Sequence, residues 1–511
     1  MRLRRTLLAA ALVLTACTGS GDGASGTATP GTTAPRGSTP GSGTGGTTAS
    51  TAPEGAPLEW TDFGDSGRVQ TSSLLVPVDY EDPSKGTFDL YLARHLADPD
   101  QRIGTLLVNP GGPGLGGSDF AIYADQVYSK TLLARFDIVG WDPRGTGLSE
   151  PAIDCIDDYD PYFDGLDITP DTDAERQRSV DLAKQFADAC VARSGDILAY
   201  VGTNESARDI DTIRRALGEE RISYFGFSYG SELGTTWATM FPDTVRAIAV
   251  DGAADPNADL LTTALQQATG FERALDTFLA RCSGDRSCTF HSKGDAEGAF
   301  DSLMASLDEE PIPTVDGRPD LTRAMALTGV SQALYSEADW PRLADALRDA
   351  RDGDGQGLLD LFDEYYRRSP DGTWSNVLEA FQVISCQDSP ERDTVAEDDA
   401  DTARFRAVAP RTFPNTVGGY FCTFLPPSQD PRIEITGKGA GPILVMGTTG
   451  DPSTPIEASR NMAAALEDGR LVVVNAEGHT GYTTSRCATK AIDDYLVDPV
   501  ANAPAEGATC P

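Results

Sequence analysis

The sequence predicts an α/β protein in which a mostly parallel sheet is flanked by helices and carries an inserted, mainly helical cap. Short apolar runs recur along the chain, and their hydrophobicity is continuous rather than alternating, which is typical of strands buried on both faces. Helical or loop segments separate these runs. From residue 255 to 438 the helical pattern continues without a convincing central strand, so this stretch is expected to be an insertion that covers one edge of the sheet.

The chain opens with a segment that resembles a bacterial lipoprotein signal peptide. Arginines crowd the first five residues, and the apolar stretch 7–14 is too short to span a bilayer. Leu14-Thr15-Ala16-Cys17 then resembles a lipobox. The resemblance implies cleavage before Cys17 and a lipid on its thiol, which would anchor the mature chain to the outer face of the cytoplasmic membrane. The alternative is an ordinary secretory signal with an incidental cysteine.

Residues 18–56 are expected to form a flexible tether between the anchor and the folded chain. This stretch consists almost wholly of Gly, Ser, Thr, Ala and Pro. It cannot bury enough apolar surface to offset the entropy lost on ordering it. We therefore expect the folded part to begin near residue 57 and the tether to carry no chemistry.

The charge balance argues against one broad class of function. The chain has 41 Lys and Arg against 78 Asp and Glu, which gives a net charge of −37. A surface that binds nucleic acid needs basic clusters, and we find none in the sequence. The acidity suits an extracellular protein, whose expected membrane contact is the lipid anchor alone.

The cysteine count predicts disulfides. Eight cysteines remain after Cys17, and an even number in an exported chain is typical of paired cysteines. They are Cys155, Cys190, Cys282, Cys288, Cys386, Cys422, Cys487 and Cys510. The short Cys282–Cys288 loop and the place of Cys510 beside the C-terminus favour pairing in sequential order. No pair has zinc-ligand spacing with histidines nearby, so the sequence predicts neither a metal site nor a cofactor.

The elements can be assigned in order from the apolar pattern. The folded part opens with an expected antiparallel pair, 69–78 and 87–95, joined through a Pro- and Gly-containing turn. Six buried strands are expected after it: 105–108, 136–139, 222–225, 247–250, 443–446 and 471–474. Three longer runs with helical periodicity lie in the insertion: 260–278, 324–347 and 358–366. The chain therefore divides into an expected core, 57–254 and 439–511, and an expected cap, 255–438.

Gly226-Phe227-Ser228-Tyr229-Gly230 lies between an expected strand and an expected helix. Gly-x-Ser-x-Gly in that context is typical of a nucleophile elbow, a turn so tight that a side chain at either glycine would collide with its neighbours. The strained central residue presents its hydroxyl at the N-terminus of the next helix, where the dipole favours a developing anion. Ser228 is the candidate nucleophile, and the alternative is a chance match in a Gly-rich chain.

A serine hydroxyl needs a base to remove its proton, and the chain has 3 histidines. His95 and His291 are expected to be structural. His479 follows the last expected strand and is the candidate base. Asp451 lies in the stretch 447–452, which directly follows strand 443–446, and is the candidate acid that would accept the second N–H of the imidazole. The alternative for Asp451 is a turn residue that caps the next helix.

Two backbone N–H groups are expected to form an oxyanion hole. One belongs to Tyr229, which follows the nucleophile, and the other belongs to the loop Asn109-Pro110-Gly111-Gly112-Pro113-Gly114, in which Gly112 is the predicted donor. A Gly-rich loop after a strand can instead cradle phosphate. That alternative lacks support because the sequence has neither Gly-Lys-Ser/Thr nor a dinucleotide fingerprint.

Taken together, these motifs resemble those of the secreted tripeptidyl aminopeptidases, serine peptidases of the prolyl-aminopeptidase branch of the α/β-hydrolases. The matching stretches are 109–114, 141–149, 226–230, 450–452 and 478–479, and the match covers roughly Leu58 to the C-terminus. The resemblance implies an α/β-hydrolase fold with Ser228 as nucleophile, Asp451 as acid and His479 as base. It also implies that the sequence after about Val408 is the C-terminal region typical of these enzymes.

Two further expectations concern charged residues near these motifs. The stretch Trp141–Ser149 is interpreted as a structural wall of the site in which Asp142 and Arg144 pair with each other. Glu232 lies four residues beyond the nucleophile, which on a helix brings it near the face of the serine. It can bind the terminal ammonium of a substrate, or it can pair with a local Arg or Lys, and the sequence leaves both possibilities open.

The sequence thus predicts a lipid-anchored or secreted extracellular serine exopeptidase that removes short peptides, with tripeptides expected, from free N-termini. One alternative keeps the triad and acts on an ester or lactone, because the fold and triad do not determine the acyl group. An alternative of another class is a surface lipoprotein that binds solutes without catalysis. The sequence does not determine the oligomeric state.

Overall fold

The computed structural model of the chain describes residues 57–390, 392–412 and 420–511. The predicted signal segment, the lipobox with Cys17 and the tether lie outside these residues. The described chain contains a 10-stranded sheet in the order β1-β2-β3-β5-β4-β6-β7-β8-β9-β10. Its strands are β1 Thr61–Asp62, β2 Val69–Pro77, β3 Thr87–His95, β4 Gly104–Asn109, β5 Phe136–Trp141, β6 Ile222–Phe227, β7 Val245–Asp251, β8 Ile443–Gly450, β9 Gly469–Glu477 and β10 Ala508–Cys510.

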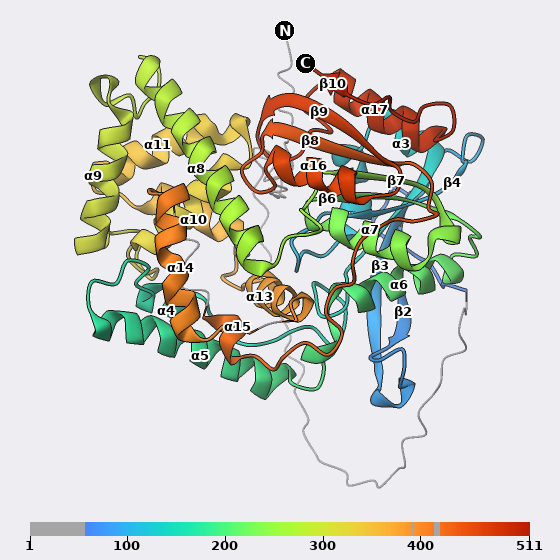
Figure 1. The fold of residues 1–511 in the computed structure, drawn as a ribbon, viewed down its shortest axis with the longest axis horizontal. Helices are drawn as coiled ribbons and strands as arrows, with labels where there is room; N and C mark the ends of the chain where they lie inside the picture. The colour runs from blue at the N-terminus through green and yellow to red at the C-terminus, as the bar shows by residue number, and fades with distance from the viewer. Residues whose placement is uncertain (1–56, 391, 413–419) are drawn as a thin grey trace, which may run out of the picture.

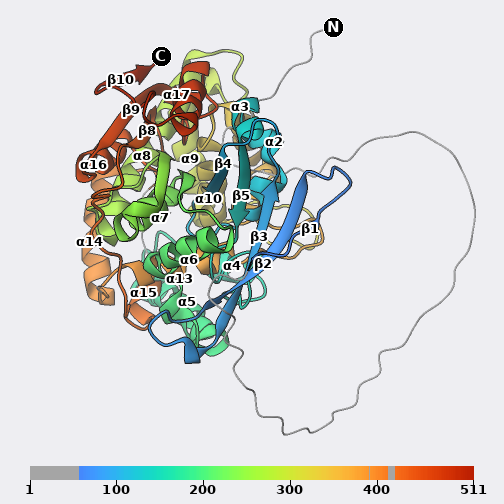
Figure 2. The same ribbon diagram turned by 90° about the vertical axis from the view of Figure 1, so that its right-hand side faces the viewer.

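The predicted antiparallel pair is confirmed at one edge of the sheet. β2 and β3 pair from Val69 opposite His95 to Pro77 opposite Thr87. Only Leu92–His95 of β3 continue the pairing into β5, so the turn end of this hairpin projects beyond the neighbouring strands (Figure 1, Figure 2). β1 adds a short antiparallel edge on β2.

From β5 to β10 the sheet is parallel, as predicted. Every residue of β6 is buried, and so are most residues of β4, β5 and β7, which explains their continuous hydrophobicity. β10 was not predicted. It has three residues, too few for a pattern to emerge, and it pairs with β9 at the far edge.

Helices cover both faces of the parallel strands. Alternate residues of a strand point to opposite faces. On β4, Leu107 packs with the side of α6 and α7, whereas Leu106 and Val108 pack with the side of α1, α3 and α17. The core helices are α1 Ser118–Ile122, α2 Ala124–Val127, α3 Lys130–Arg135, α6 Thr203–Ala216, α7 Tyr229–Met240, α16 Ile456–Ala465 and α17 Arg486–Val497.

The insertion between β7 and β8 is helical, and none of the strands of the described chain lies in it. Figure 1 shows its helices gathered beside the sheet. They are α8 Leu260–Gly284, α9 Ala296–Glu309, α10 Arg323–Leu334, α11 Trp340–Arg351, α12 Gln356–Tyr365, α13 Val377–Asp388, α14 Val395–Val408 and α15 Phe421–Phe424. Short 3-10 turns complete the described chain: η1 Pro83–Lys85, η2 Leu198–Tyr200, η3 Pro242–Thr244, η4 Ser292–Gly294 and η5 Glu337–Asp339.

One helix assignment was wrong. The run 324–347 forms two helices, α10 and α11, separated by residues 335–339. Ser336 leaves the helix and its hydroxyl accepts the N–H of Ala338, while Pro341 lies in the first turn of α11. Side-chain capping and proline favour a new helix start at this place, although the apolar periodicity runs on through it.

Two helices from before the insertion also lie against the cap. α4 Asp160–Gly165 and α5 Asp173–Ser194 occupy the cap side of the molecule in Figure 1. Phe163 of α4 packs on Phe362 of α12 with ring centroids 4.9 Å apart, and Val180 and Ala183 of α5 pack on Tyr420. The cap thus rests on a helical excursion between β5 and β6 as well as on the sheet.

The predicted sequential pairing of the cysteines is confirmed. The disulfides are Cys155–Cys190, Cys282–Cys288, Cys386–Cys422 and Cys487–Cys510. Disulfides of this number are typical of proteins that fold in an oxidising compartment, outside the cytosol. In the described part of the chain, no helix has both the length and the apolar character needed to cross a membrane.

Candidate active site

Ser228 lies in a strained turn between β6 and α7, with φ 54° and ψ −126°. A Cβ at Gly226 would approach the carbonyl oxygen of Gly230 to 2.3 Å, and one at Gly230 would lie 2.9 Å from the carbonyl oxygen of Asn109. Both positions therefore require glycine. The backbone N–H of Ser228 donates to the carbonyl of Asp251 at 2.9 Å, which ties the turn to the end of β7.

His479 and Asp451 form a buried pair at the ends of β9 and β8. Nδ1 of His479 lies 2.9 Å from each carboxylate oxygen of Asp451. The carboxylate also accepts backbone N–H groups of Ser453 at 2.9 Å and Thr454 at 2.8 Å. These donors orient the carboxylate toward the ring. Nδ1 of the imidazole therefore carries the hydrogen, and Nε2 carries a free lone pair that can accept a proton.

The other nitrogen of the imidazole is available for chemistry. Nε2 of His479 is buried and has no hydrogen-bond partner within the described residues. A cap residue holds the ring from the other side. Tyr335, which follows α10, packs edge-on against the imidazole with ring centroids 5.4 Å apart, and its carbonyl accepts the N–H of His479 at 2.8 Å. The cap thus takes part in positioning His479.

Asp251 supports both halves of this arrangement and was missed in the sequence. Its carboxylate accepts N–H groups of Gly481 at 2.8 Å and Tyr482 at 2.7 Å, just beyond His479. Its carbonyl holds Ser228, as described above. Complete burial raises the pKa of the Asp251 carboxyl to about 7. The last residue of an apolar strand run gives no sequence signal for such a role.

The predicted oxyanion loop runs directly against the serine turn. A Cβ at Gly111, where φ is +102°, would lie 2.6 Å from the carbonyl oxygen of Phe227 and 2.8 Å from Cβ of Ser228. The N–H of Gly111 donates to Oδ1 of Asn109 at 2.9 Å. Within the described residues, the N–H of Gly112 donates no hydrogen bond, and that of Tyr229 opens α7 without an acceptor.

Ser228, His479 and Gly112 line one cavity of about 280 Å³ at the boundary of core and cap. The core side is completed by Pro110, Pro113, Leu115 and Ser453. The cap side comes from α8, α10, the end of α12 and α13, with Tyr335 and Thr412. The helices and the turn after α12 contribute Gln267, Phe271, Thr328, Ser331, Gln332, Glu364, Tyr365, Tyr366, Arg367, Val377, Leu378, Phe381 and Gln382. Predicted residues far apart in sequence thus meet around a single space closed by the cap.

Glu232 does not line this cavity. Its carboxylate forms an ion pair with Arg432, which also donates to the carbonyls of Pro256 and Ala258 at the start of the insertion. Of the two possibilities left open by the sequence, the structure therefore shows pairing with a basic residue. That residue is 200 positions away rather than local.

A second buried carboxyl connects the cap to the turn. Asp388 ends α13 and accepts the N–H of Thr203 at 2.7 Å and its hydroxyl at 2.6 Å. The same hydroxyl lies 2.5 Å from the phenol oxygen of Tyr229. Burial, together with the nearby Glu232, raises the pKa of Asp388 to about 7. The residue after the nucleophile is therefore fixed from the cap side.

The expected pair between Asp142 and Arg144 is wrong. Arg144 is fully buried and forms a two-point ion pair with Asp209 of α6, with distances of 2.8 and 2.6 Å. Asp142 instead accepts N–H groups of Ser118 and Leu148. Side chains close together on a turn point in different directions, so Asp142 and Arg144 contact different partners. The stretch does not form a wall of the cavity, because none of residues 141–149 lines it.

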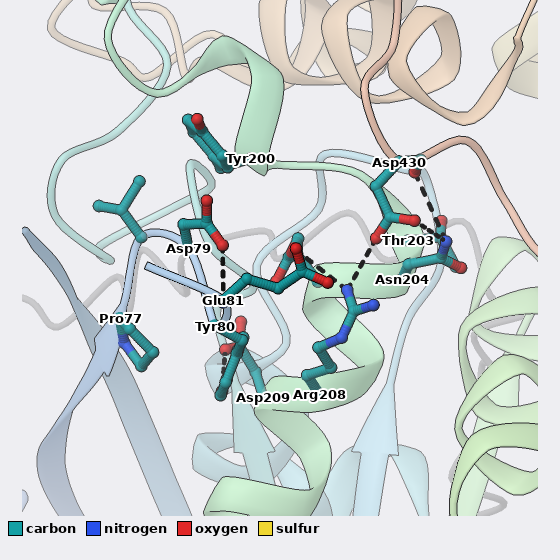
Figure 3. Close-up of polar contacts among 12 residues, drawn as sticks. Pro77, Asp79, Tyr80, Glu81, Tyr200, Thr203, Asn204, Arg208, Asp209 and Asp430 are labelled. Atoms are coloured by element: carbon teal, nitrogen blue, oxygen red, sulfur yellow. Dashed lines mark hydrogen bonds and ion pairs between the residues drawn. The ribbon is translucent and has the colours of Figure 1, made fainter. Parts of the chain in front are cut away.

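Figure 3 shows polar contacts of Asp209 and of neighbouring residues on α6. The hydroxyl of Tyr80 donates to Asp209 at 2.8 Å. Arg208, one position earlier on α6, pairs with Asp430 at 2.8 Å, and Asn204 donates to the same carboxylate at 2.9 Å. These contacts hold α6 between the β2–β3 hairpin and the segment that returns from the cap.

The other two histidines lie away from the cavity, as expected. His95 ends β3 and is buried. His291 lies in the cap, where its Nδ1 is 3.0 Å from the carbonyl oxygen of Cys282. In the described part of the chain, the structure has no group of three or more His, Cys, Asp or Glu side chains that could hold a metal ion.

Comparison with known proteins bears on this arrangement. A family model for the alpha/beta hydrolase fold matches residues 104–296, and a model for TAP-like protein matches residues 414–510. Serine protease Hip1 of Mycobacterium tuberculosis is 36% identical over 485 residues, covering 89% of this chain and 91% of that protein.

Two further relatives carry different names. Carboxylesterase B of Mycobacterium tuberculosis is 33% identical over 450 residues, covering 85% of this chain and 86% of that protein. Tripeptidyl aminopeptidase of Streptomyces lividans is 28% identical over 445 residues, covering 84% of this chain and 81% of that protein.

Proposed function

Because the chain belongs to the α/β-hydrolase superfamily and is a serine peptidase related to Hip1 and to tripeptidyl aminopeptidase, we propose that it removes short peptides from free N-termini, using Ser228, His479 and Asp451. The observation that carries the proposal is the Asp451–His479 pair, with a separation of 2.9 Å, beside a strained serine on one cavity. A solute-binding protein has no use for such an arrangement.

The proposed reaction proceeds through an acyl-enzyme. Nε2 of His479 accepts the proton as Oγ of Ser228 attacks the carbonyl carbon of the scissile bond. Asp451 holds Nδ1–H and stabilises the imidazolium. The imidazolium then gives its proton to the leaving amine, and water, activated by the same Nε2, hydrolyses the ester to release the acyl peptide and regenerate the serine.

The negative charge on the carbonyl oxygen would be stabilised by the N–H groups of Gly112 and Tyr229. Neither donates to another group within the described residues, and Gly111 brings the loop against the turn. Each such donor is worth on the order of 3 kcal/mol of transition-state stabilisation.

The size of the cavity supports exopeptidase rather than endopeptidase action. At about 280 Å³ it is close to the lower end of ligand pockets, roughly 300–1,000 Å³. Helices α10, α12 and α13 close it on the cap side. A cavity of this size can hold a few residues at the end of a chain, but it is too small for a loop of a folded protein. Release of three residues per cut is part of the proposal.

The proposal places the enzyme outside the cell. The disulfides require an oxidising compartment. We include in it the lipid anchor at Cys17, the tether 18–56, a catalytic core of 57–254 and 439–511, and a cap of 255–438 that selects the substrate.

One relative is named a carboxylesterase, which supports an ester or lactone substrate as the second candidate. The two candidates share the triad and differ in the acyl group and in the need for a free amino group.

Hydrolysis by the purified full-length chain of matched chromogenic peptides of one to four residues tests the proposal. Each peptide is offered with a free and with an acetylated N-terminus, beside a simple ester. We expect a preference for the free tripeptide. Asp451→Asn should lower kcat by about 10⁴-fold because it leaves His479 in the wrong tautomer. Ser228→Ala should abolish covalent labelling by a fluorophosphonate.

Arg273→Gln is the matched control for these variants, because Arg273 pairs with Glu457 on an exposed face of α8. Cleavage of the ester alone, or equal rates on acetylated peptides, would contradict the exopeptidase assignment and leave the triad standing. Labelling of the Ser228→Ala variant would contradict the assignment of the nucleophile.

A further inference from the structure

Arg367 is a charged side chain on the cavity that the proposed reaction does not use. It lines the same space as Ser228 and His479 and is half-buried there. No group in the described residues lies within hydrogen-bond or ion-pair distance of its guanidinium. Asp119 and Asp142 act on it through space only. Burial lowers the pKa of the Arg367 guanidinium, so its surroundings solvate the positive charge poorly.

The other charges on the cavity wall are already neutralised. Glu364, one turn earlier on α12, is held by Arg342 through two contacts of 2.7 and 2.6 Å. Apart from His479, whose imidazole pairs with the carboxylate of Asp451, the remaining lining residues carry no charge. The cavity therefore has an excess of one positive charge, and it comes from Arg367.

The backbone at Arg367 is the second observation. Its φ is +53°, in the left-handed region, where a side chain costs conformational energy. The N–H of Arg368 donates to the carbonyl of Asp363 at 2.8 Å, and that of Arg367 to Glu364 at 3.2 Å. This pattern is the Schellman motif that ends α12, and Arg367 occupies the position that is usually glycine. Arginine there is unfavourable for the helix end.

Strained positions in this molecule concentrate at the site. In the described chain, five non-glycine residues have positive φ, and three of them are Ser228, Thr480 beside His479, and Arg367. Strain retained at a functional site indicates that the side chain is needed where the strain puts it. A basic residue at a helix C-terminus can also stabilise the last carbonyls, but the guanidinium of Arg367 donates to none of them.

We propose that Arg367 binds a carboxylate of the substrate and makes the enzyme selective for peptides that carry one. This inference rests on the proposed peptidase function and names its substrate class. A guanidinium offers two parallel N–H groups, which match the two oxygens of a carboxylate. Because Arg367 is half-buried on the cavity wall, such a pair would be partly shielded from water. The carboxylate belongs either to an acidic side chain or to the C-terminus of a short peptide.

Matched peptides distinguish these two sources. Comparing four-residue peptides with Glu or Gln at each position in turn tests recognition of a side-chain carboxylate. Comparing the same peptides as free acids and as amides tests recognition of the C-terminal carboxylate. For the full-length wild-type chain, we expect kcat/KM to favour one carboxylate-bearing member on the order of 10- to 100-fold, mainly through KM. Product release is measured by mass spectrometry.

Three variants separate binding from structure. Arg367→Gly removes the side chain and suits the backbone, so it should keep or raise the melting temperature while losing the carboxylate preference. Arg367→Lys should retain part of the preference. Arg368→Gln, the neighbouring residue of the same turn but not a lining residue, is the matched control and should keep it in full.

Equal kcat/KM for all matched pairs on the wild-type chain would overturn the inference, and so would an unchanged preference in Arg367→Gly. A pair of esters with and without a carboxylate is run in parallel. Hydrolysis of esters but of no peptide would refute the peptidase proposal, and the ester pair would then still decide whether Arg367 binds a carboxylate.

Discussion

Asp251 is the residue whose importance depends most on its place in the fold. Its backbone carbonyl holds the N–H of Ser228, and its carboxylate holds the two N–H groups that follow His479. It thus sets the distance between two loops that belong to different strands. It touches neither the substrate nor the reacting atoms and acts as a positioning residue.

We predict that Asp251→Asn lowers kcat by about 10- to 100-fold with little change in KM, because an amide nitrogen would face N–H donors and displace the histidine loop. Kinetics on the best peptide substrate provide the measurement. Asp255→Asn is the control, because Asp255 is also buried but bonds Gln266 and Asn461 rather than the triad loops. Unchanged kcat together with a lower melting temperature would show a purely structural role.

At the scale of elements, the cap is attached to the core by buried polar contacts as well as by packing. α13 contributes two of these contacts, because Glu379 accepts the N–H of Ile156 at 2.9 Å and Asp388 holds Thr203. Within the cap, the same helix is linked to α15 by the Cys386–Cys422 disulfide. The same helix lines the cavity through Phe381 and Gln382. The position of α13 therefore couples cap stability to the shape of the substrate space.

We predict that removing the Cys386–Cys422 disulfide by paired alanines costs about 4 kcal/mol of unfolding free energy, against about 2 kcal/mol for Cys282–Cys288, because the entropy of closing a loop rises with its length. The sequence separations are 36 and 6. Urea denaturation of the two double variants provides the measurement. Loss of Cys386–Cys422 should also weaken substrate binding, whereas loss of the short loop should not. Equal costs would contradict the loop-length account.

At the scale of the whole molecule, burial creates carboxyl groups that stay protonated near neutral pH. Burial is the main cause for each of Asp251, Glu379 and Asp388, and it raises their pKa values to about 7. In the unfolded chain these groups titrate near 4. Between about pH 4 and 7 the folded state therefore binds more protons than the unfolded state, and the unfolding free energy falls as the pH rises.

We predict that this fall is about 1.4 kcal/mol per pH unit for each such group, and that Glu379→Gln removes one share of it. Urea unfolding of the wild type and the variant at pH 5, 6 and 7 measures the difference. The exposed pair partner Glu457, changed to Gln, is the control and should leave the slope intact. Parallel curves for wild type and Glu379→Gln would contradict the raised pKa of Glu379.

Local signals in the sequence by themselves determined the strand runs, the glycine-flanked turn at Ser228, and the order of strands and helices along the chain. They favoured the sequential disulfides without determining them. Each depends on neighbours in the chain: continuous hydrophobicity marks a strand buried on both faces, and a tight turn admits only glycine. The roles of Ser228, Asp451 and His479 stay predictions, although Ser228 and His479 line one cavity and Asp451 pairs with His479.

Only the tertiary structure decided which distant groups meet. Arg144 pairs with Asp209 rather than Asp142, and Glu232 pairs with Arg432 from the last part of the insertion. Arg367 reaches the cavity because α12 ends beside the cavity. Asp251 reaches the loop after β9 because β7 and β9 both pair with β8. Such partners depend on how helices and strands pack against one another, and the spacing of residues along the chain does not predict that packing. A buried charged side chain pairs with a residue of another element, because an unpaired charge is costly once it is buried.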